Sequence, residues 1–224
     1  MYTQMILPNL PHGIIVLLLF LPVIATIANF ARYVLGIRTL GIYPALSLAF
    51  AFLLTGFRYG MIITTLVFAI SSLSYSLIKY TRMHYVSKIT VIYTANAIFL
   101  ILAFTLFTQA PFFSNVLNLD FNEINPAGVL LIAVLIDFFV KQTVKKDWFT
   151  ATRSFIETII VSSIGFLIIR IPRFDLILVK YAWIIPLLII VNVIIGQGSN
   201  LKLLEILRFK QIIVKPNPQD DKSS

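Results

Sequence analysis

Seven long apolar runs divide this chain, and they constrain its fold more than any other feature of the sequence. The runs cover residues 13–31, 44–57, 61–78, 89–107, 127–140, 155–171 and 176–196. Only 12% of the 224 residues are charged, whereas a soluble domain has about 25% charged residues. Backbone groups in lipid must bond within their own segment, and the alternation typical of a barrel is absent, so each run is predicted to be a helix. The sequence therefore predicts an all-α membrane protein with seven transmembrane helices over residues 13–197.

The positive charges indicate how the chain is oriented in the lipid bilayer. If all seven runs span and the N-terminus lies outside, 14 of the 18 Lys and Arg residues fall on the inner side. Positive residues gather on the cytoplasmic side of membrane proteins. We therefore expect a protein of the cytoplasmic (inner) membrane, with an outer N-terminal segment over residues 1–12 and the C-terminus inside.

Two of the runs are short and open on a proline, Pro44 for the first and Pro126 for the second. Each run has 14 residues, which gives about 21 Å of helix against about 30 Å of hydrocarbon. These short helices either span a locally thinned bilayer or dip in and return to the same side. The second arrangement reduces the charge split to 12 against 6, so the positive charges favour spanning.

The same pattern introduces both short runs. Ile42-Tyr43-Pro44-Ala45 and Ile124-Asn125-Pro126-Ala127 lie 82 positions apart, and each stands in the middle of a group of three runs. Because three spans is an odd number, the second group enters from the opposite face. We interpret this as an inverted 3+3 repeat followed by one further helix, an arrangement common in secondary transporters. The alternative is that proline is simply favoured in the first turn of a helix.

The C-terminal region differs from the apolar runs in composition. Residues 198–214 alternate apolar side chains with Lys and Arg, which predicts an amphipathic helix lying on the inner face of the membrane. Residues 215–224 are polar and contain prolines, so we expect a disordered tail.

A candidate anion site precedes the first short run. Arg32, Arg38 and Thr39 place two cations and a hydroxyl just before a helix N-terminus, where free N–H groups and the helix dipole favour negative charge. Gly36 and Gly41 permit close approach of the backbone. We predict that these residues bind a carboxylate or phosphate on the cytoplasmic side. The alternative is that the arginines are orientation anchors that contact lipid headgroups.

Two acids stand out because charged residues are rare within the runs. Asp137 lies about 15 Å into its predicted helix, and an acid at that depth is a candidate for proton coupling or for holding a substrate amine. Its alternative is a structural pair with Lys141, four residues on. Glu157 follows Arg153 by four residues, so a structural pair is favoured over a functional role.

The composition argues against several kinds of chemistry. The chain has no Cys and two His, so neither a metal site nor a bound cofactor is expected. No nucleotide-binding loop and no nucleophile–base set is visible, and we therefore do not expect an enzyme. The net charge of +9 is distributed between the apolar runs, as membrane orientation requires, and it does not indicate a nucleic-acid partner.

Several segments together resemble a known bacterial family. They are residues 21–32, residues 36–41, residues 44–52, Leu135-Ile136-Asp137-Phe138-Phe139 and Leu204-Glu205-Ile206-Leu207-Arg208-Phe209. They are similar to the seven-helix membrane region usually fused to an inactive transglutaminase-like domain, with Asp137 in place of a family Glu. A weaker similarity links the Pro-led helices to the small membrane subunit of poly-gamma-glutamate synthesis.

The resemblance implies partners and a function. Family members are often encoded beside ATP-grasp ligases of the glutamate-ligating type, so we expect a cytoplasmic ligase as partner. No transglutaminase-like stretch is visible in the 224 residues, so that partner is expected as a separate periplasmic protein. The first hypothesis is transport or translocation of an anionic amino-acid or peptide conjugate. The second is a non-transporting scaffold that recruits the ligase, and nothing in the sequence indicates an oligomeric state.

Overall fold

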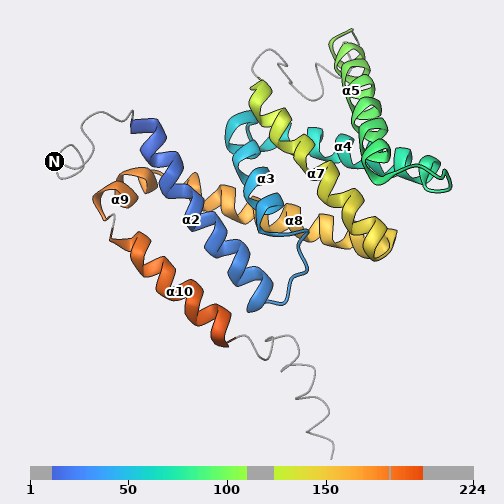
Figure 1. The fold of residues 1–224 in the computed structure, drawn as a ribbon. Helices are drawn as coiled ribbons and strands as arrows, with labels where there is room; N and C mark the ends of the chain where they lie inside the picture. The colour runs from blue at the N-terminus through green and yellow to red at the C-terminus, as the bar shows by residue number, and fades with distance from the viewer. Residues whose placement is uncertain (1–11, 110–123, 182, 199–224) are drawn as a thin grey trace, which may run out of the picture.

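The described part of the chain is entirely helical and contains no strand. The structure, a computed structural model, describes residues 12–109, 124–181 and 183–198 (Figure 1). Its helices are α2 (His12–Tyr33), α3 (Ile42–Thr55), α4 (Phe57–Ile78), α5 (Tyr85–Gln109), α7 (Pro126–Lys145), α8 (Trp148–Ile169), α9 (Phe174–Lys180) and α10 (Ile184–Gly198). The prediction of an all-α membrane protein is confirmed. Nearly all of the N-terminal segment, the amphipathic helix and the disordered tail lie outside the described residues.

Among the described residues, five helices are long and apolar enough to cross a membrane: α2, α4, α5, α7 and α8. Of the two predicted short helices, α3 is short at 14 residues, but α7 has 20. The prediction is wrong for α7 because its last turns continue through polar residues up to Lys145. A helix needs internal backbone bonds rather than apolar side chains, and lysines near its end extend toward water.

The seventh run is one helix in the prediction and two in the structure. Helices α9 and α10 meet at 94°. Pro186 is the third residue of α10, in the first turn, where a missing N–H is tolerated. The proline therefore allows a new helix to begin here.

Helix α3 forms the centre of the fold and packs against α2, α4, α7 and α8 (Figure 1). Its Leu48, Ala51 and Phe52 side chains are completely buried. A Cβ atom on Gly128 of α7 would lie 2.3 Å from Thr55 Cγ2 of α3, so the α7 backbone lies directly against the Thr55 side chain. This short apolar helix thus packs against four other helices, which reduces its need for a full hydrophobic length.

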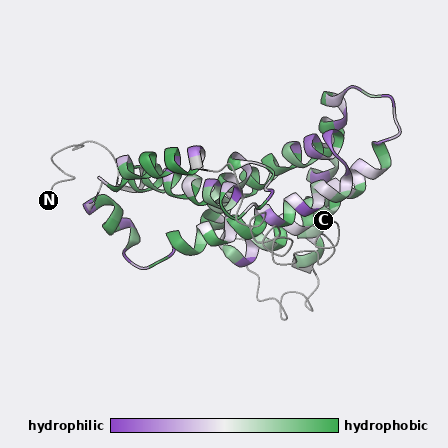
Figure 2. Ribbon diagram, turned by 90° about the horizontal axis from the view of Figure 1, so that it is seen from below, coloured by the Kyte–Doolittle hydropathy of each residue, from purple (hydrophilic) through white to green (hydrophobic). Residues whose placement is uncertain are grey.

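The outer surfaces of the helices are apolar. Figure 2 shows hydrophobic residues along most of the helices. Large side chains such as Leu73, Leu102 and Ile189 are exposed, which is typical of a surface that faces lipid rather than water. Between helices, polar side chains bond to each other: Asn29 Nδ2 donates to Asn192 Oδ1 at 2.7 Å, linking α2 to α10. Such bonds hold membrane helices together where the hydrophobic effect cannot.

Candidate functional site

The turn that joins α2 to α3 is held against α8 by two hydrogen bonds. The backbone N–H of Arg38 donates to Glu157 Oε2, and the backbone N–H of Leu40 donates to Thr158 Oγ1 at 2.9 Å. Glu157 also accepts from Arg153 Nε at 2.8 Å. The predicted Arg153–Glu157 pair is therefore present, and the same carboxylate fixes the turn that carries Arg38.

Two glycines let the chain make this turn. Gly36 has φ of 75° and Gly41 has φ of 155°, within the region that side chains with a Cβ rarely adopt. A Cβ on Gly41 would also come within 3.3 Å of Pro44 Cδ. Pro44 is buried in the first turn of α3, and Pro126 begins α7. The two glycines therefore determine the path of the turn, and the two prolines lie in the first turns of α3 and α7.

A polar pocket of about 400 Å³ lies between this turn and the end of α7. Its polar lining comes from Arg32, Arg38 and Thr39 on the side of the turn, and from Gln142 and Lys146 on the side of α7. The three residues of the predicted anion site thus line one pocket. The structure adds a third cation and an amide from more than 100 positions later in the chain.

The charges in this pocket are of one sign. None of Arg32, Arg38 and Lys146 forms an ion pair with another residue of the described ranges. The nearest acid to the turn, Glu157, is already occupied by Arg153 and by a backbone N–H. A concave site lined by several cations that form no ion pair attracts carboxylates and phosphates and can bind them through charge-assisted hydrogen bonds.

Thr39 gives the pocket a second, uncharged feature. The residue is only 6% exposed, and its Oγ1 has no hydrogen-bond partner within the described part of the chain. Leaving a buried hydroxyl unpaired costs about 1–3 kcal/mol. An acceptor oxygen bound in the pocket would remove this cost, because the hydroxyl could then donate to it.

A structural explanation accounts for part of the pocket's charge. Arg32 lies in the last turn of α2, and Lys146 is the C-cap of α7. Cations at helix C-termini stabilise the helix dipole. Arg38 stands on the turn rather than at a helix C-terminus, so the dipole does not explain its position or the unpaired Thr39 hydroxyl.

Asp137 is not part of this pocket. It is partly buried on α7, and its Oδ1 accepts a hydrogen bond from the Tyr85 hydroxyl of α5 at 3.1 Å. The alternative pair with Lys141 is not among the ion pairs of the described residues. Further along the same two helices, α3 and α7 pack closely: Ser47 Oγ donates to Leu131 O at 2.8 Å, and Gly128 packs against Thr55.

The acid beside the pocket has a structural role. Asp147, next to Lys146, accepts a hydrogen bond from the Thr150 backbone N–H at 3.1 Å and caps α8. Hydrogen bonding from Thr150, through its side chain first and its backbone second, lowers the pKa of the Asp147 carboxyl below its ordinary value. Within the described residues, no group of three or more His, Asp or Glu could hold a metal ion.

A family model described as seven transmembrane helices usually fused to an inactive transglutaminase matches residues 3–213. The chain belongs to this family. No curated protein and no solved structure matches it. The match confirms the resemblance drawn from the first and last signature segments, and it covers every helix of the described structure.

For this member of the transglutaminase-associated family, sequence reasoning missed Gln142 and Lys146 as pocket residues. Lys146 contributed only to the count of inner charges, since no local pattern connects it to the Arg32–Thr39 segment. Gly128 was also missed. Its signal was present, because a glycine within a helix has low helical propensity and often marks close packing.

Proposed function

We propose that this membrane protein binds the anionic groups of an amino-acid or peptide conjugate in the pocket formed by Arg32, Arg38, Thr39 and Lys146. The observation that carries the proposal is the convergence of three unpaired cations with a buried, unpaired hydroxyl. Several separate cations suit a ligand with more than one carboxylate better than a single small anion. The positive-inside distribution supports a cytoplasmic position for the pocket.

The family supports the class of ligand. Its frequent association with glutamate-ligating ATP-grasp enzymes implies a product that is rich in carboxylates, made in the cytoplasm. The proposed role is to receive that product at the inner face and to take part in its transport or translocation. In this scheme Asp137 acts as a coupling acid on α7, apart from the binding pocket.

The binding step is tested with purified protein and a triglutamate peptide as probe. Lys146→Gln and Arg38→Gln should each weaken binding about tenfold or more, because each removes a charge-assisted contact. Arg58→Gln is the matched control, since Arg58 lies in the first turn of α4 and does not line the pocket. Equal affinity in the pocket and control variants would refute the assignment of the site.

The transport step is tested separately in vesicles loaded with the same peptide. Asp137→Asn should reduce export while leaving triglutamate affinity within about twofold, because Asp137 lies outside the pocket. Unchanged export would remove Asp137 from the mechanism.

A second candidate function is a scaffold that holds the ligase at the membrane. The close packing of α3 against α7 favours a scaffold. A scaffold binds its ligand at the pocket and needs no path for the ligand between these helices. The scaffold predicts that deleting residues 201–224 abolishes ligase pull-down while triglutamate affinity is retained. It also predicts that Asp137→Asn has no effect on either measurement.

A further inference from the structure

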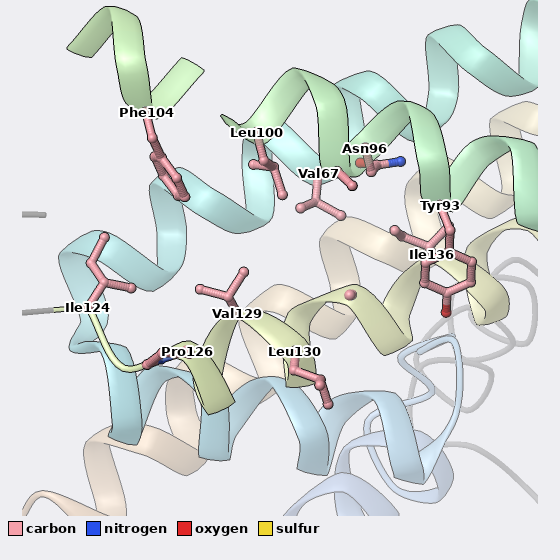
Figure 3. Close-up of a pocket in the computed structure, with 12 residues that line it drawn as sticks. Val67, Tyr93, Asn96, Leu100, Phe104, Ile124, Pro126, Val129, Leu130 and Ile136 are labelled. Atoms are coloured by element: carbon pink, nitrogen blue, oxygen red, sulfur yellow. The ribbon is translucent and has the colours of Figure 1, made fainter. Parts of the chain in front are cut away.

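A second pocket, mostly apolar, lies between α4, α5 and α7, away from the basic turn (Figure 3). Its volume is about 560 Å³, within the range of about 300–1,000 Å³ typical of small-molecule sites. Of the 12 residues that line it, all but Tyr93 and Asn96 are apolar. None of them belongs to the basic pocket.

Asn96 presents an unused acceptor at this pocket. The residue is 2% exposed, and its Oδ1 has no hydrogen-bond partner within the described part of the chain. Its Nδ2 donates to Ile92 O at 2.9 Å and to Ser71 Oγ at 3.0 Å. A carbonyl oxygen can only accept, so the bond to Ile92 fixes which end of the amide is the nitrogen. The unpaired atom is therefore the oxygen, and Figure 3 shows it on the side of Val67 and Leu100.

Neither water nor a plain hydrocarbon chain satisfies this oxygen well. A trapped water needs two to four polar partners, but the only other polar side chain of the lining, Tyr93, directs its hydroxyl away from the Asn96 amide in Figure 3. An acyl chain would fit the apolar walls but would leave the buried acceptor unpaired. The best match is a molecule that combines an apolar body with one O–H or N–H donor.

We propose that the pocket between α4, α5 and α7 binds an amphiphile whose single apolar chain packs along Leu100, Phe104 and Val129 and whose hydroxyl or amide donates to Asn96 Oδ1. The pocket runs from Ile124 and Pro126 at the start of α7 to Tyr93 and Ile136 further along the helices. The three helices that form the pocket are long and apolar enough to cross a membrane, and entry of the chain from the lipid side is part of this proposal. This assignment does not rest on the proposed anion function.

The test uses full-length protein in lipid nanodiscs and two photoreactive probes, a long-chain alcohol with a diazirine on its chain and the methyl ether of the same alcohol. In the wild type we expect the alcohol to label peptides of α5 and α7 about tenfold more than the ether, since only the alcohol can donate. Asn96→Leu should bring the two probes to equal labelling. Ser71→Ala is the matched control, because it removes a partner of Nδ2 and leaves Oδ1 in place, so the preference should persist.

A third variant guards against misfolding of Asn96→Leu. Leu100→Trp fills part of the pocket and leaves the residue at position 96 unchanged, and it should reduce labelling by both probes. Equal labelling by alcohol and ether in the wild type would overturn the proposal and identify the occupant as a plain lipid chain. Arg32→Gln should leave labelling unchanged, which separates this site from the anion pocket.

Discussion

The contact between α3 and α7 makes a quantitative prediction about Gly128. An alanine here would place Cβ 2.3 Å from Thr55 Cγ2 and 3.3 Å from Ala51 O. Thr55 cannot turn away cheaply, because it is buried and its Oγ1 donates to Ala51 O at 2.8 Å. Overpacking of this kind costs about 1–3 kcal/mol, and the contact distance places Gly128→Ala at the upper end. Alanine regains about 1 kcal/mol of helix propensity, so the net loss is about 2 kcal/mol.

This loss is measured by thermal unfolding in detergent, where it should lower Tm by about 4–8 °C. Gly196→Ala is the matched control, because a Cβ there meets nothing within 4 Å in the described structure, so Tm should stay equal or rise. Thr55→Ser removes Cγ2 and keeps the hydroxyl, and it should restore most of the loss in the Gly128→Ala background. If the two substitutions simply add, or if Gly128→Ala behaves like Gly196→Ala, the inferred backbone approach is incorrect.

Three further predictions concern the rest of the described structure. Asn192→Leu breaks the bonds to Asn29 and Thr26 and should lower stability by about 1 kcal/mol, seen as a fall in Tm of a few degrees. Asp147→Ala should also lower Tm, while Asp147→Asn keeps an acceptor for the cap of α8. Folding lowers the pKa of the Asp147 carboxyl below 3.8. The stabilisation of the protein by the ionised carboxylate is therefore present above pH 3.8 and is lost as the pH falls through the pKa of the folded state. Asp147→Asn should reduce this fall of Tm at acid pH. A cysteine at Arg58 should react with an impermeant label from outside, and labelling only from the cytoplasm would contradict spanning by α3.

Much of the fold follows from composition and backbone chemistry. The first six apolar runs each correspond to one helix, because a chain in lipid has no other way to satisfy its N–H and C=O groups. The ends were less predictable. Helix α7 continues past Asp137 to Lys145, since lysine stems lie along a helix while their charges reach water. The break before α10 comes shortly before Pro186 and interrupts a long apolar run that suggested continuity.

The site was predictable only where its residues are close in sequence. Arg32, Arg38 and Thr39 fall within eight positions, so a single turn brings them together. Gln142 and Lys146 join them only because α7 ends beside the start of α3, which is a property of packing. The bond between Asp137 and Tyr85 depends on packing as well. From the sequence alone, Lys141 on the same helix was the visible partner.

The packing of α3 against α7 separates the two proposed functions. The basic pocket lies at the start of α3 and the end of α7, whereas Thr55 and Gly128 meet at the opposite ends of these helices. Passage of a conjugate between them requires those opposite ends to part, and a scaffold has no such need. A Cβ on residue 128 would lie 2.3 Å from Thr55 Cγ2, and Cγ2 is one carbon–carbon bond from the Cβ of Thr55. The Cβ atoms of residues 55 and 128 would therefore be within about 3.8 Å, close enough for a disulfide.

The chain contains no cysteine, so a Thr55→Cys, Gly128→Cys variant forms only the intended cross-link. Comparing its oxidised and reduced forms cancels any strain from the substitutions themselves. If the protein moves the conjugate between α3 and α7, oxidation should stop export of triglutamate from vesicles, and reduction should restore it, while triglutamate affinity at the pocket stays within about twofold. Export that continues in the cross-linked form would show that these ends need not separate. Movement between α3 and α7 would then be refuted, with the binding site left intact.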